Sequence, residues 1–271
     1  MRFGRVGTCV AASGAYLIFR IATSYVRLGH LNHRLALFLA GASVIIFMLV
    51  QLAVVVGFVG MQIRLKSALM IFLGSAAVFV GILLLPRTRP SEIMVVLGLV
   101  SQLSLVLLAI SLGYMVSFIV REPNILLPAA VCAAFVDYWN VTMGPLGQML
   151  EKRPDIVEKV AVHVPAMATG MPLVMIGMGD IVFLALFFGV LFRFSMNVNG
   201  AFWLGFILLT ISLFVAMLGI PIPALVPMGI AILAANARHF KLKREELFAT
   251  LYVGIFLLIL LIASAIFMLK R

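Results

Sequence analysis

Two aspartates lie inside stretches of sequence that are otherwise almost entirely apolar. The chain carries nine acidic residues, and seven of them fall in or beside predicted loops: Glu92, Glu122, Glu151, Asp155, Glu158, Glu245 and Glu246. The other two, Asp137 and Asp180, lie within or just inside apolar segments. A carboxylate at the centre of a lipid bilayer costs roughly 2.5–3.5 kcal/mol on insertion scales. Because the chain has so few acids, we treat these two as candidate catalytic residues.

Two carboxyl groups held together in apolar surroundings can divide an acid–base reaction between them. Like charges a few ångström apart do not both ionise easily, so one carboxyl keeps a proton while the other is charged. The charged group can then take a proton from water while the protonated group donates to a carbonyl oxygen, as in aspartic proteases. If the fold brings Asp137 and Asp180 together, the pair predicts hydrolysis of peptide bonds.

Glycines and prolines mark irregular or closely approached backbone near the second aspartate and further along the chain. Gly177 and Gly179 precede Asp180, and the absence of a Cβ lets a neighbouring helix or an extended substrate come close to the backbone. The segment 221–227 reads PIPALVP, and its three prolines withhold backbone donors. Non-helical backbone at membrane depth is tolerated where it lines a cavity or is buried in protein, so this segment is a candidate part of the same site.

The composition is that of an integral membrane protein. Of the 271 residues, 65% are hydrophobic and 11% are charged, whereas soluble domains have about 45–50% and about 25%. The mean hydropathy is +1.25, and apolar runs of about 18 or more residues, long enough to cross a hydrocarbon core of about 30 Å, recur throughout. We predict an all-α, multi-pass membrane protein with about nine transmembrane helices, at residues 6–26, 35–60, 67–85, 93–120, 125–142, 176–193, 200–219, 221–237 and 247–269.

The predicted spans form a single membrane domain, 1–271, in which the two aspartates flank one long loop. Residues 1–120 supply the N-terminal helices, 125–237 the catalytic helices with the loop 143–175, and 247–269 a C-terminal helix. Asp137 lies near the end of the span that enters the loop, and Asp180 near the start of the span that leaves it. Both are therefore expected at similar depth on the same side of the membrane. The apolar part of the loop, 160–175, is too short and interrupted to span, and either lies along the interface or folds back, where it would plug a substrate groove.

The aspartates, glycines and prolines together resemble a known family. Asp137 in one span, Gly177-x-Gly179-Asp180 at the start of the next, and Pro223-Ala224-Leu225 two spans later are similar to the pattern of the presenilin and signal peptide peptidase family of intramembrane aspartyl proteases. The short loop resembles a compact prokaryotic homologue, which would lie in the cell membrane. The resemblance implies that Asp137 and Asp180 are the catalytic pair and that Pro223, Ala224 and Leu225 shape the active site and contact the substrate. It also implies substrates that are single-span membrane proteins or signal-peptide-like segments, bound as extended strands.

The chain departs from the family pattern at three places. An aromatic residue, most often tyrosine, usually precedes the first aspartate, but here the residue is Val136. Four predicted spans rather than five precede Asp137, and the span 247–269 follows the Pro-Ala-Leu segment. The first and last spans therefore cannot be assigned by analogy.

The main alternative is a secondary transporter or ion channel in which Asp137 and Asp180 relay protons or cations. Transporters also use broken helices near the middle of the membrane, but no internal repeat is evident. A zinc protease would need His-Glu-x-x-His on a helix, whereas the four histidines, at 30, 33, 163 and 239, fall in predicted loops. A rhomboid-type serine protease would need Gly-x-Ser-Gly, of which only a fragment is present. We therefore expect no metal and no cofactor.

The positive charge points to the lipid bilayer rather than to nucleic acid. There are 20 Lys and Arg residues against nine acids, a net charge of +11, and the basic residues lie in short loops where they contact headgroups. Nine of them fall on one predicted side and ten on the other, so the orientation stays open. Cys9 and Cys132 lie in apolar runs and are not expected to form a disulfide.

Four polar side chains within the predicted spans have expected roles. Arg20 is the only basic residue well inside a span, and we expect its side chain to extend toward a helix end. Gln51, Gln102 and Asn140 are expected to form interhelical hydrogen bonds. Asn140 follows Asp137 by three residues on the same helical face, so it is also a candidate to orient that carboxyl.

Overall fold

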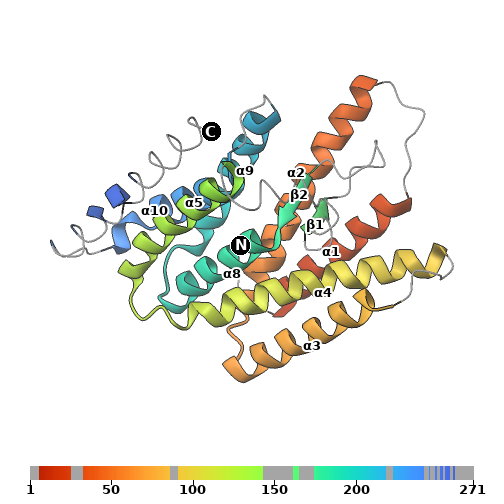
Figure 1. The fold of residues 1–271 in the computed structure, drawn as a ribbon, viewed down its shortest axis with the longest axis horizontal. Coiled ribbons are helices and arrows are strands. Elements are labelled where there is room, and N and C mark those ends of the chain that lie inside the picture. The colour runs from red at the N-terminus through yellow and green to blue at the C-terminus, as the bar shows by residue number, and fades with distance from the viewer. Residues whose placement is uncertain are drawn as a thin grey trace, which may run out of the picture. The chain divides into compact units, whose positions relative to one another are not determined.

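The structure is a computed structural model whose ribbon is drawn in Figure 1. It describes residues 6–25, 33–85, 91–142, 161–164, 174–217 and 222–240, together with 244, 248, 251–252, 254–256 and 259. The helices are α1 (Val6–Tyr25), α2 (His33–Gly60), α3 (Leu65–Leu83), α4 (Ser91–Ser117), α5 (Leu126–Thr142), α8 (Met178–Arg193), α9 (Val198–Met217) and α10 (Leu225–Ala235). The short 3-10 helices are η1 (Pro123–Ile125) and η2 (Ala237–His239), and the strands are β1 (Ala161–Val164) and β2 (Val174–Gly177).

The prediction of a mainly helical protein is confirmed for the described part of the chain, and several of its helices are apolar enough to be membrane spans. Five helices contain stretches long and apolar enough to cross a membrane, namely Val6–Thr23, Gly41–Gly60, Leu65–Leu83, Val95–Ser117 and Val198–Val215. Two further apolar helices, Pro123–Trp139 and Leu225–Ala235, are shorter. Eight of the nine predicted spans coincide with described helices, whereas most of 247–269 lies outside the described residues. The count of nine therefore stays a prediction.

The chain divides into two compact units. Unit 1 comprises Met1–Ser117 with Glu158–Gly189, and unit 2 comprises Phe118–Val157 with Val190–Arg271. In unit 1, α1 packs against α2 and α3 against α4. In unit 2, α10 packs against both α5 and α9. Asp137 belongs to unit 2 and Asp180 to unit 1, and each unit is described by itself.

Close approaches of backbone hold the helices of unit 1 together. A Cβ added to Gly57 of α2 would lie 3.1 Å from the Cα of Cys9 in α1. Gly113 of α4 is closer still to α8, because a Cβ there would overlap the carbonyl oxygen of Val182. The sequence therefore uses glycine where a main chain must touch its neighbour, as is common between membrane helices.

One short pair of strands departs from the all-helical prediction. β1 and β2 are antiparallel, with Ala161 opposite Gly177 and His163 opposite Met175. Because residues 174–177 are extended, the helix that carries Asp180 begins at Met178 rather than at the predicted residue 176. Of the segment 160–175 that was expected to lie along the interface or to fold back, only 161–164 and 174–175 are among the described residues. A plug in a substrate groove therefore stays untested.

In unit 2, small residues bring α10 close to its neighbours. A Cβ on Gly229 of α10 would lie 3.6 Å from the Cβ of Ala130 in α5. On the other side, a Cβ on Gly205 of α9 would lie 3.8 Å from the Cβ of Ala231 in α10. The predicted span 221–237 is helical only from Leu225, because residues 222–224 are non-helical, in accordance with the prolines that precede the helix.

Candidate active site

Asp137 lies in the second half of α5, where its carboxylate binds the start of α10. Its Oδ2 accepts a hydrogen bond of 2.9 Å from the backbone N–H of Leu225. Leu225 is the first residue of α10 and lies 88 positions further along the chain. The side chain of Asp137 is half-buried. Two of the three segments that carry the family resemblance are therefore in direct contact within unit 2.

This contact caps the start of α10, where most other backbone N–H groups are already bonded or are absent. Val226 donates its N–H to the carbonyl of Pro223 at 3.2 Å, and Met228 donates to the carbonyl of Ala224 at 3.3 Å. Pro227, between them, has no N–H. Ala224 occupies the N-cap position but forms no side-chain cap. Asp137 therefore supplies from another helix the acceptor that serine, threonine or aspartate usually supplies at this position.

The three residues of the Pro-Ala-Leu segment are not equally accessible. The side chains of Pro223 and Leu225 are buried, and Leu225 is only 4% exposed. Ala224 is half-buried. The segment therefore presents the Leu225 amide to Asp137 and turns two of its three side chains into the interior of unit 2.

Asp180 is the third residue of α8 and lies in its first turn. The N-terminal turn of a helix favours negative charge, because its backbone N–H groups point toward that end. Strand β2 ends at Gly177, so only Met178 and Gly179 separate this strand from the aspartate. The carboxyl of Asp180 is half-buried and takes part in interactions of its own.

The two glycines before Asp180 differ in their surroundings. A Cβ added to Gly177 would lie 3.4 Å from Oδ2 of Asp180, whereas a Cβ added to Gly179 would meet nothing within 4 Å. A side chain at 177 would therefore lie in van der Waals contact with the carboxyl of Asp180, whereas a side chain at 179 would enter open space. The sequence motif does not distinguish the two glycines, but their surroundings differ.

The predicted site residues fall into two groups that match the two units. Asp137, Pro223, Ala224 and Leu225 come together in unit 2, and Gly177, Gly179 and Asp180 come together in unit 1. Each aspartate lies at the N-terminal end of a helix. Asp137 accepts the first amide of α10, and Asp180 lies in the first turn of its own helix α8. The pairing of the two carboxyls with each other stays a prediction.

The other polar residues of the spans differ in whether their side chains form hydrogen bonds. Arg20 is 8% exposed, so the expectation that its side chain extends toward a helix end is wrong. It donates to the Tyr16 hydroxyl and to Oε1 of Gln102, each at 3.2 Å, and it stacks on the rings of Tyr16 and Phe47. The interhelical hydrogen bond expected of Gln102 is thereby confirmed. Gln51 is buried and neither of its amide atoms has a partner among the described residues, which contradicts its expected hydrogen bond.

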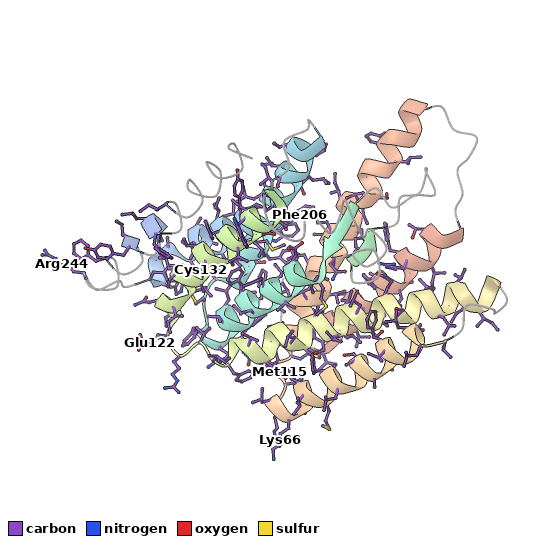
Figure 2. The ribbon with its side chains drawn as sticks, in the orientation of Figure 1. Lys66, Met115, Glu122, Cys132, Phe206 and Arg244 are labelled. Carbon is purple, nitrogen blue, oxygen red and sulfur yellow. The ribbon has the colours of Figure 1, made fainter. Side chains whose placement is uncertain are left out.

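Three charged residues of predicted loops are at the surface, as expected. Lys66, Glu122 and Arg244, labelled in Figure 2, are all exposed. Cys132, also labelled, lies on α5 five residues before Asp137 and is a free thiol, as is Cys9. The side chain of Asn140 lies outside the described residues, so its expected role is untested. Within the described part of the chain, no group of three or more His, Cys, Asp or Glu residues could hold a metal ion.

Sequence inspection missed a pair of asparagines in unit 2. Asn197 and Asn236, which lie 39 residues apart in the sequence, join the start of α9 to the end of α10. Asn236 is completely buried. The one available signal was that Asn197 precedes the predicted span 200–219 and Asn236 lies at the end of the predicted span 221–237, since asparagine is common at helix ends.

Comparisons with known proteins identify no relative of this chain. No known protein family matches the sequence, no curated protein resembles it, and no solved structure resembles its fold.

Proposed function

We propose that this chain is an intramembrane aspartyl protease that hydrolyses peptide bonds in membrane-spanning segments of other proteins. The observation that carries the proposal is the hydrogen bond between Asp137 and the Leu225 amide. It joins the first and third elements of the sequence pattern, which lie 88 residues apart along the chain. A carboxylate whose role was only to cap a helix would not require Asp180 and Gly177 beside a second apolar helix.

In the proposed mechanism, Asp137 and Asp180 share one proton and act on a water molecule. The water oxygen attacks the carbonyl carbon of the substrate, one of its protons passes to the charged carboxylate, and the protonated carboxyl donates to the carbonyl oxygen. In the resulting diol, the carboxyl that took the proton from water passes it to the amide nitrogen as the C–N bond breaks. The carboxyl that donated to the carbonyl oxygen takes a proton back from the diol, so the pair returns to its starting state.

The described geometry supports a distinct role for each neighbouring segment. The Leu225 amide occupies Oδ2 of Asp137 and so fixes the orientation of that carboxyl. The extended strand β2 leads directly to Asp180, where an extended substrate segment can pair with backbone groups. Single-span membrane proteins and signal-peptide-like segments are the proposed substrates, since they present an apolar helix that can be unwound in the membrane. No cofactor is required for this chemistry.

The test is cleavage of a single-span reporter by the purified protein in proteoliposomes. We expect Asp137→Asn and Asp180→Asn each to lower kcat by about 10²–10⁴-fold, the usual contribution of general acid–base catalysis. Glu122→Gln is the matched control, since Glu122 is exposed and lies outside the apolar helices. Equal cleavage by the wild type and both Asn variants would refute the proposal.

The same proteoliposomes test the transporter alternative. A transporter or channel that used Asp137 and Asp180 as a relay would move protons or cations across the vesicle wall and leave the reporter intact. Uptake that is abolished by Asp180→Asn, together with an uncut reporter, would replace the protease proposal with the transporter.

A further inference from the structure

Two asparagines hold the end of α10 that lies opposite the Asp137 contact. The backbone N–H of Asn197 donates to Oδ1 of Asn236 at 2.7 Å, and the side-chain Nδ2 of Asn197 donates to the carbonyl of Ala235 at 3.3 Å. Asn236 donates its Nδ2 to the carbonyl of Ile232 at 3.0 Å. We refer to Asn197 and Asn236 as the asparagine clasp.

Asn197 also forms a hydrogen bond that is not part of the link between Asn197 and α10. Its Oδ1 accepts the N–H of Gly200 at 2.9 Å, which caps the start of α9. One atom of this amide therefore serves α9, and the other atom serves α10. A substitution that changes only the nitrogen removes the side-chain bond to Ala235 and leaves the cap of α9 in place, while the backbone N–H of Asn197 can still donate to Asn236.

The sides of α10 pack closely against α5 and α9. Gly229 approaches Ala130 and Ala231 approaches Gly205, and the larger side chains of Met228 and Ile232 are buried. The hydrogen bonds at the two ends are directional, so they restrain the axial position of the helix in addition to this packing.

We propose that the asparagine clasp positions the Leu225 amide on Asp137. α10 has 11 residues, so its ends are about 16 Å apart at 1.5 Å per residue. A rigid helix of this length transmits an axial shift at Asn236 to Leu225 almost unchanged. Asn197 and Asn236 are therefore positioning residues for Asp137. The catalytic part of this inference rests on the proposed protease function, whereas the hydrogen-bond part does not.

Three variants separate positioning from folding. Asn197→Asp keeps the oxygen that caps α9 but replaces the nitrogen that donates to Ala235. Asn236→Ala removes both side-chain hydrogen bonds of the buried residue. Arg238→Ala is the control, because Arg238 is exposed and lies at the same end of α10. If Asn236→Ala does not fold, Asn197→Asp still tests the link to Ala235, since α9 keeps its cap and a carboxylate oxygen there repels the carbonyl of Ala235 instead of donating to it.

The first measurement is hydrogen–deuterium exchange of the segment 221–228, which needs no enzymatic activity. Its three prolines leave only five backbone amides, at residues 222, 224, 225, 226 and 228, so one exposed amide changes the signal measurably. We expect Asn197→Asp and Asn236→Ala to raise the exchange of this segment toward the level of Asp137→Ala, and Arg238→Ala to leave it at the wild-type level. Exchange in both asparagine variants that equals wild type would overturn the inference, as would an unchanged Asp137→Ala variant.

The second measurement is the cleavage kinetics of the reporter. A displaced catalytic group lowers kcat, and a misplacement of about 1 Å can cost about 100-fold. We expect the two asparagine variants to lower kcat by about 10–100-fold with KM changed less than about 2-fold. If the wild type does not cleave at all, the protease proposal fails while the exchange result still decides the role of the clasp. Raised exchange with unchanged kcat would show that the clasp holds α10 but has no part in catalysis.

Discussion

The bond between Asp137 and Leu225 predicts that two substitutions of the same aspartate differ in stability. Asp137→Asn retains an oxygen that can accept the Leu225 amide, and Asp137→Leu has nearly the same shape but no acceptor. Both variants remove the carboxyl and are expected to be inactive in the cleavage assay. They differ in whether the first amide of α10 keeps its partner.

The magnitude follows from the surroundings of the bond. Leaving a buried donor unpaired costs about 1–3 kcal/mol, and the half-buried site of Asp137 places the expected cost in the lower part of that range, at about 1–2 kcal/mol. The charge that Asn lacks interacts with the N-terminus of α10, which is worth about 0.3–1 kcal/mol at exposed sites. We therefore expect Asp137→Asn to unfold within about 1 kcal/mol of wild type and Asp137→Leu to be less stable than Asp137→Asn by about 1–2 kcal/mol.

The assay is reversible unfolding in mixed micelles with increasing denaturing detergent, followed by circular dichroism and tryptophan fluorescence. The informative quantity is the difference between the two variants, because the loss of charge and of activity is common to both. Equal free energies of unfolding for Asp137→Asn and Asp137→Leu would show that the Leu225 amide does not depend on this side chain, and the reasoning from the cap would be refuted.

Three further predictions concern glycines and a buried amide. Gly177→Ala places a methyl group in van der Waals contact with the carboxyl of Asp180, so we expect a larger loss of cleavage rate than for Gly179→Ala, whose methyl group enters open space and which should stay within about 2-fold; the reverse order would contradict the geometry. Gly113→Ala drives a methyl group into a main-chain carbonyl of α8, and such overpacking costs about 1–3 kcal/mol or more. Gly98→Ala on the same helix α4 meets no other atom within 4 Å and should stabilise the protein by up to about 1 kcal/mol. Unfolding of both variants in detergent measures the difference between them. Gln51→Leu removes a buried amide that has no partner in the described part of the chain, so we expect it to raise the free energy of unfolding by about 1–2 kcal/mol. A lower free energy of unfolding than that of the wild type would indicate that the amide has a partner.

The sequence was sufficient to predict most of the helices and the irregular backbone before α10, because both follow from composition and local chemistry. Apolar runs predict spans through their length alone, and prolines predict that α10 begins late. The contact between Asp137 and Leu225 could be expected only as part of a site. Nothing in the two local sequences indicates that a carboxylate of one helix would accept the first amide of another.

Features that depend on distant partners could not be predicted. Residues 174–177 are extended because they pair with 161–164, and neither segment shows a clear alternation that would mark a strand. Arg20 was expected near a helix end because basic side chains usually reach water. Its burial depends on Gln102, which lies 82 residues away in the sequence, and on the face of Phe47. The asparagine clasp was missed for the same reason.

The shortness of α10 has a consequence for how the membrane meets this protein. A helix of about 16 Å crosses only half of a hydrocarbon layer of about 30 Å, and the residues 222–224 before it are non-helical. Peptide groups without helical partners are not stable in contact with lipid tails, so they must face protein or water. The interruption that shortens α10 is shielded by the protein itself, because Pro223 is buried and the Leu225 amide bonds to Asp137, so α5 insulates this break from the lipid tails.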